Sequence, residues 1–174
     1  MTADQYRLLI REVPDFPKPG ILFYDITTLL KDPAAFAAIA DELTAYYRNQ
    51  RINKVVGIES RGFIFGGTLA QRLNAGFVPV RKPGKLPADR FEVKYDLEYG
   101  STSLAIHRDA ISQGERVLIV DDLLATGGTA AATVLLVRQL GGEIAGLDFL
   151  VELKILKGRE KLTGYPIHST IIYP

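Results

Sequence analysis

Two adjacent aspartates followed by a glycine-rich loop are the part of this sequence most suggestive of chemistry. Asp121 and Asp122 end an apolar run in the stretch RVLIVDDLLATGGTAA (116–131), and a small, polar loop from Ala125 to Thr129 follows them. Two neighbouring carboxylates are poor direct neighbours of an anion, yet this loop has the composition of an anion site. A ligand for both must therefore place a cationic or hydroxyl-rich part beside the acids and an anionic group at the loop.

The loop ATGGT has the properties of a phosphate site. At the start of a helix beginning near Gly128, four N–H groups lack intrahelical partners and the helix dipole adds positive charge. We expect Gly127 and Gly128 to take positive φ and approach the phosphate closely, and Thr126 and Thr129 to add hydroxyl donors. Neither GxxxxGK[ST] nor GxGxxG is present. A tight turn with Thr129 as a simple N-cap is the alternative.

Ribose would suit the acidic pair, because a carboxylate accepts hydrogen bonds from vicinal hydroxyls. A phosphate on the 5′ carbon of that ribose would then reach the loop. The order of acids and loop therefore predicts a ribose 5-phosphate site, and a solvated acidic turn is the alternative. Its residues would be Asp121, Asp122, Ala125, Thr126, Gly127, Gly128 and Thr129.

Short apolar strands alternate with helices around this stretch. Asp32 and Pro33 read as N-cap and N1 of a helix that runs to about residue 49. Further helices are expected at 63–73 and 129–140, and strands at 54–58, 76–81, 116–120, 143–153 and 167–173. This alternation predicts an α/β fold with a mostly parallel central sheet flanked by helices. Ligands of such sheets bind at the carboxyl ends of the strands, where Asp121 and Asp122 are expected.

Size and composition favour one cytoplasmic domain. The 174 residues suffice for a single core, and the chain contains no cysteine. No apolar run approaches the roughly 18 residues that a membrane-spanning helix needs, and the first residues do not resemble a secretion signal. With a formal net charge of +1 there is no global electrostatic attraction to nucleic acid or membrane. We expect neither as a partner.

One segment interrupts the alternation. Residues 82–103, KPGKLPADRFEVKYDLEYGSTS, are polar, contain prolines and glycines, and have no sustained period. A loop of this length is typical of a linker or a functional lid. We favour a lid because the segment also carries Lys82, Lys85 and Glu98, with a solvated hairpin as the alternative. It is called the lid segment below.

Five stretches of the sequence together resemble the type I phosphoribosyltransferase family, and specifically its adenine-specific members. VLIVDDLLATGGT is similar to the family's phosphoribosyl pyrophosphate signature. The other stretches are DFPKPGILFYDIT (15–27), GIESRGFIFGGTLA (57–70), FVPVRKPGKLP (77–87) and YDLEYGSTSLAIH (95–107). They follow the family's order and cover most of residues 15–140.

The resemblance implies an activity and an architecture. The activity is transfer of the 5-phosphoribosyl group from phosphoribosyl pyrophosphate to N9 of adenine, giving AMP and pyrophosphate in purine salvage. Mg²⁺ would be the cofactor, held mainly through the substrate because no cluster with metal-ligand spacing appears. The architecture would be a single phosphoribosyltransferase domain over 1–174, with an N-terminal hood at 1–31 and the lid at 82–103. A homodimer is also implied.

The resemblance further implies roles for individual residues. Ser60 and Arg61 match the pyrophosphate loop, in which a cis peptide between Glu59 and Ser60 is expected. Glu98 matches the catalytic acid/base, suited to taking a proton from adenine. The other matches are Arg81, Lys82 and Lys85 for pyrophosphate, with Arg81 reaching the partner subunit, and Leu22 and Phe23 for adenine through main-chain groups. Tyr24 departs from the family, in which many members have Arg there.

Two other functions compete with this hypothesis. A phosphoribosyltransferase for hypoxanthine, guanine, xanthine or orotate would share the acidic pair and the loop, although LEYG and FPKPGILF favour adenine. A regulator that senses phosphoribosyl pyrophosphate and binds DNA would need a basic reading head of about 60–80 residues. Only about 30 residues precede the first long helix here.

Overall fold

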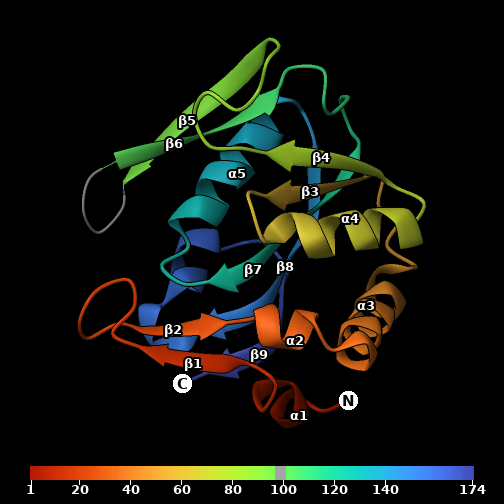
Figure 1. The fold of residues 1–174 in the computed structure, drawn as a ribbon. Helices are drawn as coiled ribbons and strands as arrows, with labels where there is room; N and C mark the ends of the chain where they lie inside the picture. The colour runs from red at the N-terminus through yellow and green to blue at the C-terminus, as the bar shows by residue number, and fades with distance from the viewer. Residues whose placement is uncertain (97–100) are drawn as a thin grey trace. The chain divides into compact units, whose positions relative to one another are not determined.

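Five parallel strands form a sheet in the order β4-β3-β7-β8-β9. In a computed structural model, which describes residues 1–96 and 101–174, this sheet dominates the part of the chain after residue 45 (Figure 1). The parallel sheet predicted from the sequence is thereby confirmed. Its strands are β3 (Lys54–Ile58), β4 (Gly76–Val80), β7 (Arg116–Leu124), β8 (Glu143–Leu153) and β9 (Ile167–Tyr173).

Two helices connect these strands in opposite directions. Helix α4 (Gly62–Arg72) leads from β3 to β4, and α5 (Gly128–Gln139) leads from β7 to β8. Because β4 and β8 lie on opposite sides of the β3–β7 pair, right-handed crossovers place the two helices on opposite faces of the sheet. The strand order therefore reverses between β3 and β7, and a crevice for a ligand is expected at their carboxyl ends.

Strand β7 is longer than the sequence predicted. It ends at Leu124 rather than at residue 120, so Asp121 and Asp122 lie within the strand and not after it. Pairing with β3 stops at Gly57 and Val120, whereas pairing with β8 continues to Leu124 and Glu152. The long partner β8 thus extends β7 beyond the end of β3. In the part of the chain that the structure describes, no strand pairs with the β3 side of β7 at the acidic pair.

The lid segment contains an antiparallel hairpin of β5 (Arg90–Asp96) and β6 (Ser101–His107). The described part of the segment is therefore a hairpin, but not the solvated hairpin of the alternative, and the lid stays a prediction. Alternate side chains of β5, namely Phe91, Val93 and Tyr95, pack against the main core, and Leu104 and Ile106 of β6 belong to it. Glu98 lies outside the described residues.

Two short 3₁₀ helices, η1 (Lys154–Leu156) and η2 (Gly158–Leu162), join β8 to β9. The hydrophobic core on the α5 face of the sheet comes mostly from α5 and from buried residues of β3, β7 and β8. It also includes Leu162 of η2. Within the described residues, no helix is long and apolar enough to cross a membrane.

Residues Met1–Ala45 form a separate compact unit, and Tyr46–Pro174 form the second. The first unit contains α1 (Ala3–Arg7), β1 (Arg11–Pro14), β2 (Leu22–Asp25), α2 (Thr27–Leu30) and most of α3 (Pro33–Tyr47). Strands β1 and β2 pair antiparallel. The expected hood, residues 1–31, falls within this unit. A single domain over 1–174 stays a prediction.

Helix α3 begins as the sequence predicts. The carboxylate Oδ1 of Asp32 accepts hydrogen bonds from the N–H groups of Ala34 at 2.9 Å and Ala35 at 3.0 Å. We expect Asp32→Ala to lower the free energy of unfolding by about 1 kcal/mol, because two N–H groups lose their acceptor. Urea unfolding measures this change. Asp32→Asn keeps an oxygen acceptor and is the matched control, and an Ala variant as stable as the Asn variant would contradict the capping role.

Candidate active site

A cavity of about 540 Å³ opens at the carboxyl ends of β3 and β7. This volume is in the range of small-molecule sites, and the position is the one expected where the strand order reverses. The residues that line it come from the turn after β3, from the segment after β4, from the hairpin, and from β7 through the start of α5. They are Glu59, Ser60, Arg61, Lys82, Tyr95, Thr102, Leu104 and all residues from 121 to 130.

The predicted phosphate loop lies in the wall of this cavity. Gly127 is the N-cap of α5 with φ of 78°, a left-handed conformation that favours glycine. Gly128 already belongs to the helix, so the expected positive φ is found at Gly127 and not at Gly128. Thr129 also lies inside the helix, which makes the simple N-cap interpretation of this residue wrong. The first residues of α5 line the cavity, and an anion bound to their N–H groups stays a prediction.

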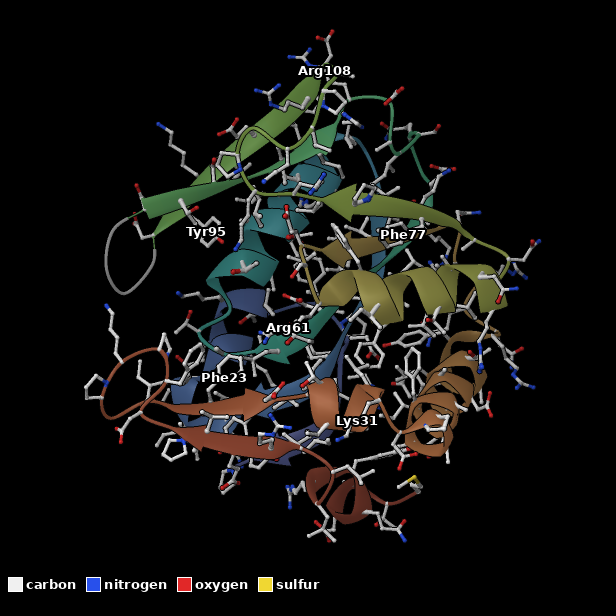
Figure 2. The ribbon with its side chains drawn as sticks, in the orientation of Figure 1. Phe23, Lys31, Arg61, Phe77, Tyr95 and Arg108 are labelled. Atoms are coloured by element: carbon white, nitrogen blue, oxygen red, sulfur yellow. The ribbon has the colours of Figure 1, made fainter. Side chains whose placement is uncertain are left out.

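One member of the acidic pair, Asp122, forms an ion pair with Arg61. Asp122 is only 7% exposed, and its Oδ2 lies 2.6 Å from Nε of Arg61. The N–H of Asp122 donates to Oδ1 of Asp121 at 2.9 Å. Arg61 lies beside β7 at the start of α4 (Figure 2). The residue predicted for pyrophosphate therefore contacts a residue predicted for ribose.

Asp121 has a strongly perturbed carboxyl. Burial raises its pKa well above the usual range, and the neighbouring charge of Asp122 raises it further. The hydrogen bond from the Asp122 N–H and the charge of Arg61 act in the opposite direction without reversing the shift. A perturbed carboxyl in a cleft is typical of a functional site.

The turn after β3 brings Ser60 and Arg61 to the cavity, and the peptide between Glu59 and Ser60 is cis, as the resemblance implied. Gly62 follows at the start of α4. A Cβ on Gly62 would lie 2.7 Å from the carbonyl oxygen of Val120, closer than side chains tolerate. Glycine therefore lets the start of α4 approach β7, which places Arg61 beside Asp122.

The structure divides the predicted basic group. Lys82 lines the cavity, whereas Arg81 pairs through Nε with Glu59 Oε2 at 3.3 Å and donates to the carbonyl of Lys85 at 3.2 Å. The main-chain N–H of Lys82 also donates to Glu59, at 2.9 Å. Burial acts to raise the pKa of Glu59, but these hydrogen bonds outweigh it and hold the pKa below its usual range.

The hairpin supplies cavity residues that the sequence did not single out for binding. Thr102 and Leu104 of β6 line the cavity, and the hydroxyl of Thr129 donates to the Tyr95 hydroxyl at 3.2 Å. Figure 2 shows Tyr95 on its hairpin strand. The alternation Phe91, Val93, Tyr95 was the available signal, because a period of two places these side chains on one face of a strand.

Other predicted residues lie elsewhere. Leu22 and Phe23 are on β2 in the unit Met1–Ala45, where the Phe23 ring meets the Phe16 ring edge-on at a centroid distance of 5.1 Å. Their adenine role stays a prediction. So does the catalytic role of Glu98, which is outside the described residues.

Oxygen atoms of the cavity side chains would suit a hard cation such as Mg²⁺, as ligands in addition to those from the substrate. They include the Asp121 and Asp122 carboxylates and the hydroxyls of Thr102, Thr126 and Thr129. Across residues 1–96 and 101–174, no group of three or more His, Cys, Asp or Glu side chains is arranged to hold a metal.

Known proteins resemble this chain over almost its whole length. The phosphoribosyl transferase domain family matches residues 25–162. An adenine phosphoribosyltransferase from Acidobacterium capsulatum is 62% identical over 99% of this chain and 96% of its own length. The crystal structure of the Thermoanaerobacter pseudethanolicus adenine phosphoribosyltransferase has a TM-score of 0.95 and 52% identity, covering 99% of this chain and 100% of its own.

A third relative is the Saccharomyces cerevisiae adenine phosphoribosyltransferase, whose crystal structure contains an iminoaltritol bisphosphate and adenine. It has a TM-score of 0.91 and 43% identity, covering 97% of this chain and 98% of its own.

The raised pKa of Asp121 has a consequence for stability. An acid whose pKa is higher in the folded than in the unfolded chain destabilises the fold once the pH exceeds the unfolded value. We expect Asp121→Asn to raise the free energy of unfolding at pH 7 by about 1 kcal/mol, with the gain vanishing below about pH 4. Urea unfolding at both pH values measures it. Asp109→Asn, at an exposed carboxyl, is the control, and an equal gain at both pH values would contradict the assignment.

Proposed function

This chain belongs to the phosphoribosyl transferase family, and we propose that it catalyses the adenine-specific reaction. It transfers the 5-phosphoribosyl group from phosphoribosyl pyrophosphate to N9 of adenine, releasing AMP and pyrophosphate. The observation that carries this function is the cavity in which the acidic pair and the phosphate loop meet the turn of Ser60 and Arg61. Identity of 62% to an adenine phosphoribosyltransferase supports the choice of base.

The phosphate loop and the acidic pair hold the ribose 5-phosphate half of the substrate. The 5′-phosphate accepts hydrogen bonds from the first N–H groups of α5 and from the hydroxyls of Thr126 and Thr129. The ribose hydroxyls donate to Asp121 and Asp122. As the bond from C1′ to pyrophosphate breaks, positive charge develops on the sugar ring, and the two acids stabilise it from nearby.

The turn after β3 receives the leaving pyrophosphate. Arg61 can form bidentate hydrogen bonds to phosphate oxygens, and Lys82 adds a mobile point charge. Arg61 would then leave its ion pair with Asp122 and bind the pyrophosphate instead. Asp122 would then be able to accept hydrogen bonds from the ribose. One Mg²⁺, bound mainly to substrate oxygens and water, supplies further positive charge at the pyrophosphate when present.

A homodimer completes the site in this proposal. Arg81 and Lys85 are basic but do not line the cavity of their own chain, and Arg81 pairs with Glu59 at the cavity wall. In the dimer Arg81 reaches the pyrophosphate of the partner subunit. The protein acts in the cytoplasm, as expected from its composition.

Adenine enters beside C1′, where N9 attacks as pyrophosphate leaves. Main-chain groups of Leu22 and Phe23 contact the base, and Glu98 takes the ring proton, because a carboxylate on a closing lid meets the base only in the reacting complex. Tyr95, three positions before Glu98, shares a hydrogen bond with Thr129 of the phosphate site. This contact supports a link between the hairpin and the bound phosphate.

The decisive experiment compares bases with one donor. Purified protein, phosphoribosyl pyrophosphate and Mg²⁺ should form AMP and pyrophosphate from adenine, and at least about 100-fold less product from guanine, hypoxanthine or xanthine, because a site built for one set of polar groups rejects others. Chromatography of the nucleotides measures this. Preference for another purine would overturn the adenine assignment, and DNA binding without any product would favour a regulator.

Glu98→Gln should lower kcat about 100-fold or more while changing the KM for phosphoribosyl pyrophosphate less than about threefold, because only proton transfer is lost. Initial rates at saturating adenine separate the two parameters. Asp89→Asn, an exposed acid beside β5, should behave like the wild type. An unchanged kcat in Glu98→Gln would remove Glu98 from the chemistry.

A further inference from the structure

The segment KGREKL, between β8 and β9, lies directly behind the phosphate loop. Gly158, the first residue of η2, is buried, and a Cβ built on it would collide with the carbonyl oxygen of Ala125 and lie 3.1 Å from the Gly127 nitrogen. A Cβ on Gly127 would collide with the carbonyl oxygen of Gly158. Main chain therefore packs against main chain here, with no space for a side chain on either side.

An ion pair fixes the position of Gly158. The neighbouring Arg159 donates through Nε and a terminal nitrogen to both oxygens of Glu152, each at 2.7 Å. Glu152 is 4% exposed and also accepts from Ser169 Oγ at 2.6 Å. A second terminal nitrogen of Arg159 donates to the carbonyl of Ile167 at 3.3 Å. These contacts tie η2 to both β8 and β9.

The same ion pair connects to the strand that carries the loop. Glu152 on β8 is the register partner of Leu124, the last residue of β7 before the loop. The loop is thus held at its entry by the β7–β8 pairing and along its back by Gly158, and Glu152 contributes to both. The hydrogen bonds from Arg159, ahead of the opposing effect of burial, keep the pKa of Glu152 below its usual range.

We propose that Gly158 and Arg159 are positioning residues for the 5′-phosphate. The proposal rests on the function assigned above. A phosphate site built from backbone N–H groups cannot adjust by changing rotamers, so the direction of its donors depends on what packs behind the loop. Gly158 sets the course of residues Ala125 to Gly127, and the bidentate Arg159 to Glu152 pair holds Gly158 in place.

The two ends of the substrate distinguish positioning from general stability. Under the proposed function, ribose 5-phosphate binds the phosphate loop. Magnesium pyrophosphate binds at Ser60, Arg61 and Lys82. A displaced loop weakens binding of the first ligand and spares the second, whereas a loosened fold weakens both.

Isothermal titration of each ligand into Gly158→Ala tests this. We expect the Kd of ribose 5-phosphate to rise about tenfold or more, because small misplacements of aligned groups are costly, and the Kd of magnesium pyrophosphate to stay within about twofold. Gly67→Ala is the matched control, since a Cβ on this helical glycine would meet no heavy atom within 4 Å apart from its own helix backbone. It should bind both ligands like the wild type.

Arg159→Lys decides the matter if Gly158→Ala does not fold. Lysine keeps the charge but loses the bidentate geometry, so ribose 5-phosphate binding should weaken about threefold or more with pyrophosphate binding unchanged. Arg138→Lys, which alters a contact to Tyr165 on the exposed side of α5, is its control.

Wild-type affinity for ribose 5-phosphate in the folded variants, or equal loss of both ligands, would overturn the proposal. If the wild type itself binds neither ligand, the assigned function fails instead, and the positioning role fails with it.

Discussion

The pairing of β3 with β7 is the constraint on which the site depends. Its register, Lys54 with Val117 through Gly57 with Val120, brings the turn at Glu59 to Arg61 beside Asp121 and Asp122, although these segments are far apart in sequence. The crossovers α4 and α5 then leave in opposite directions, so neither helix covers the ends of these two strands. A cavity at this position follows from the connectivity, and the side chains around it determine its chemistry.

Charge compensation allows two acids to share this cavity. Asp122 has Arg61 as its partner at 2.6 Å, whereas Asp121 lies where burial and its neighbour both disfavour ionisation. The fold therefore keeps a carboxyl in unfavourable surroundings, as expected where function and stability compete. Glu59 is the opposite case, since hydrogen bonds from Arg81 and Lys82 favour its charged form.

Local patterns predicted much of this structure. β3, β8 and β9 have their predicted bounds, and Asp32 caps α3 as expected, because apolar runs and capping residues act over a few positions. The extension of β7 to Leu124 was missed because it depends on the length of a neighbouring strand. KGREKL gave no chemical signal, since Gly158 acts through its lack of a side chain. The hairpin was only an alternative, because its polar composition hid the alternation that ends at Tyr95.

The phosphate loop is short in sequence, but its shape is not a local property. Its entry depends on the pairing of β7 with β8, its back on η2, and its exit on α5, which packs against β7, β8 and the β5–β6 hairpin. A synthetic peptide of residues 116–131 would contain every donor and still lack the conformation that aims them. If Gly158 and Arg159 set its course as proposed, the loop acquires that conformation during synthesis only after the ribosome has added these two residues, when nearly the whole chain exists.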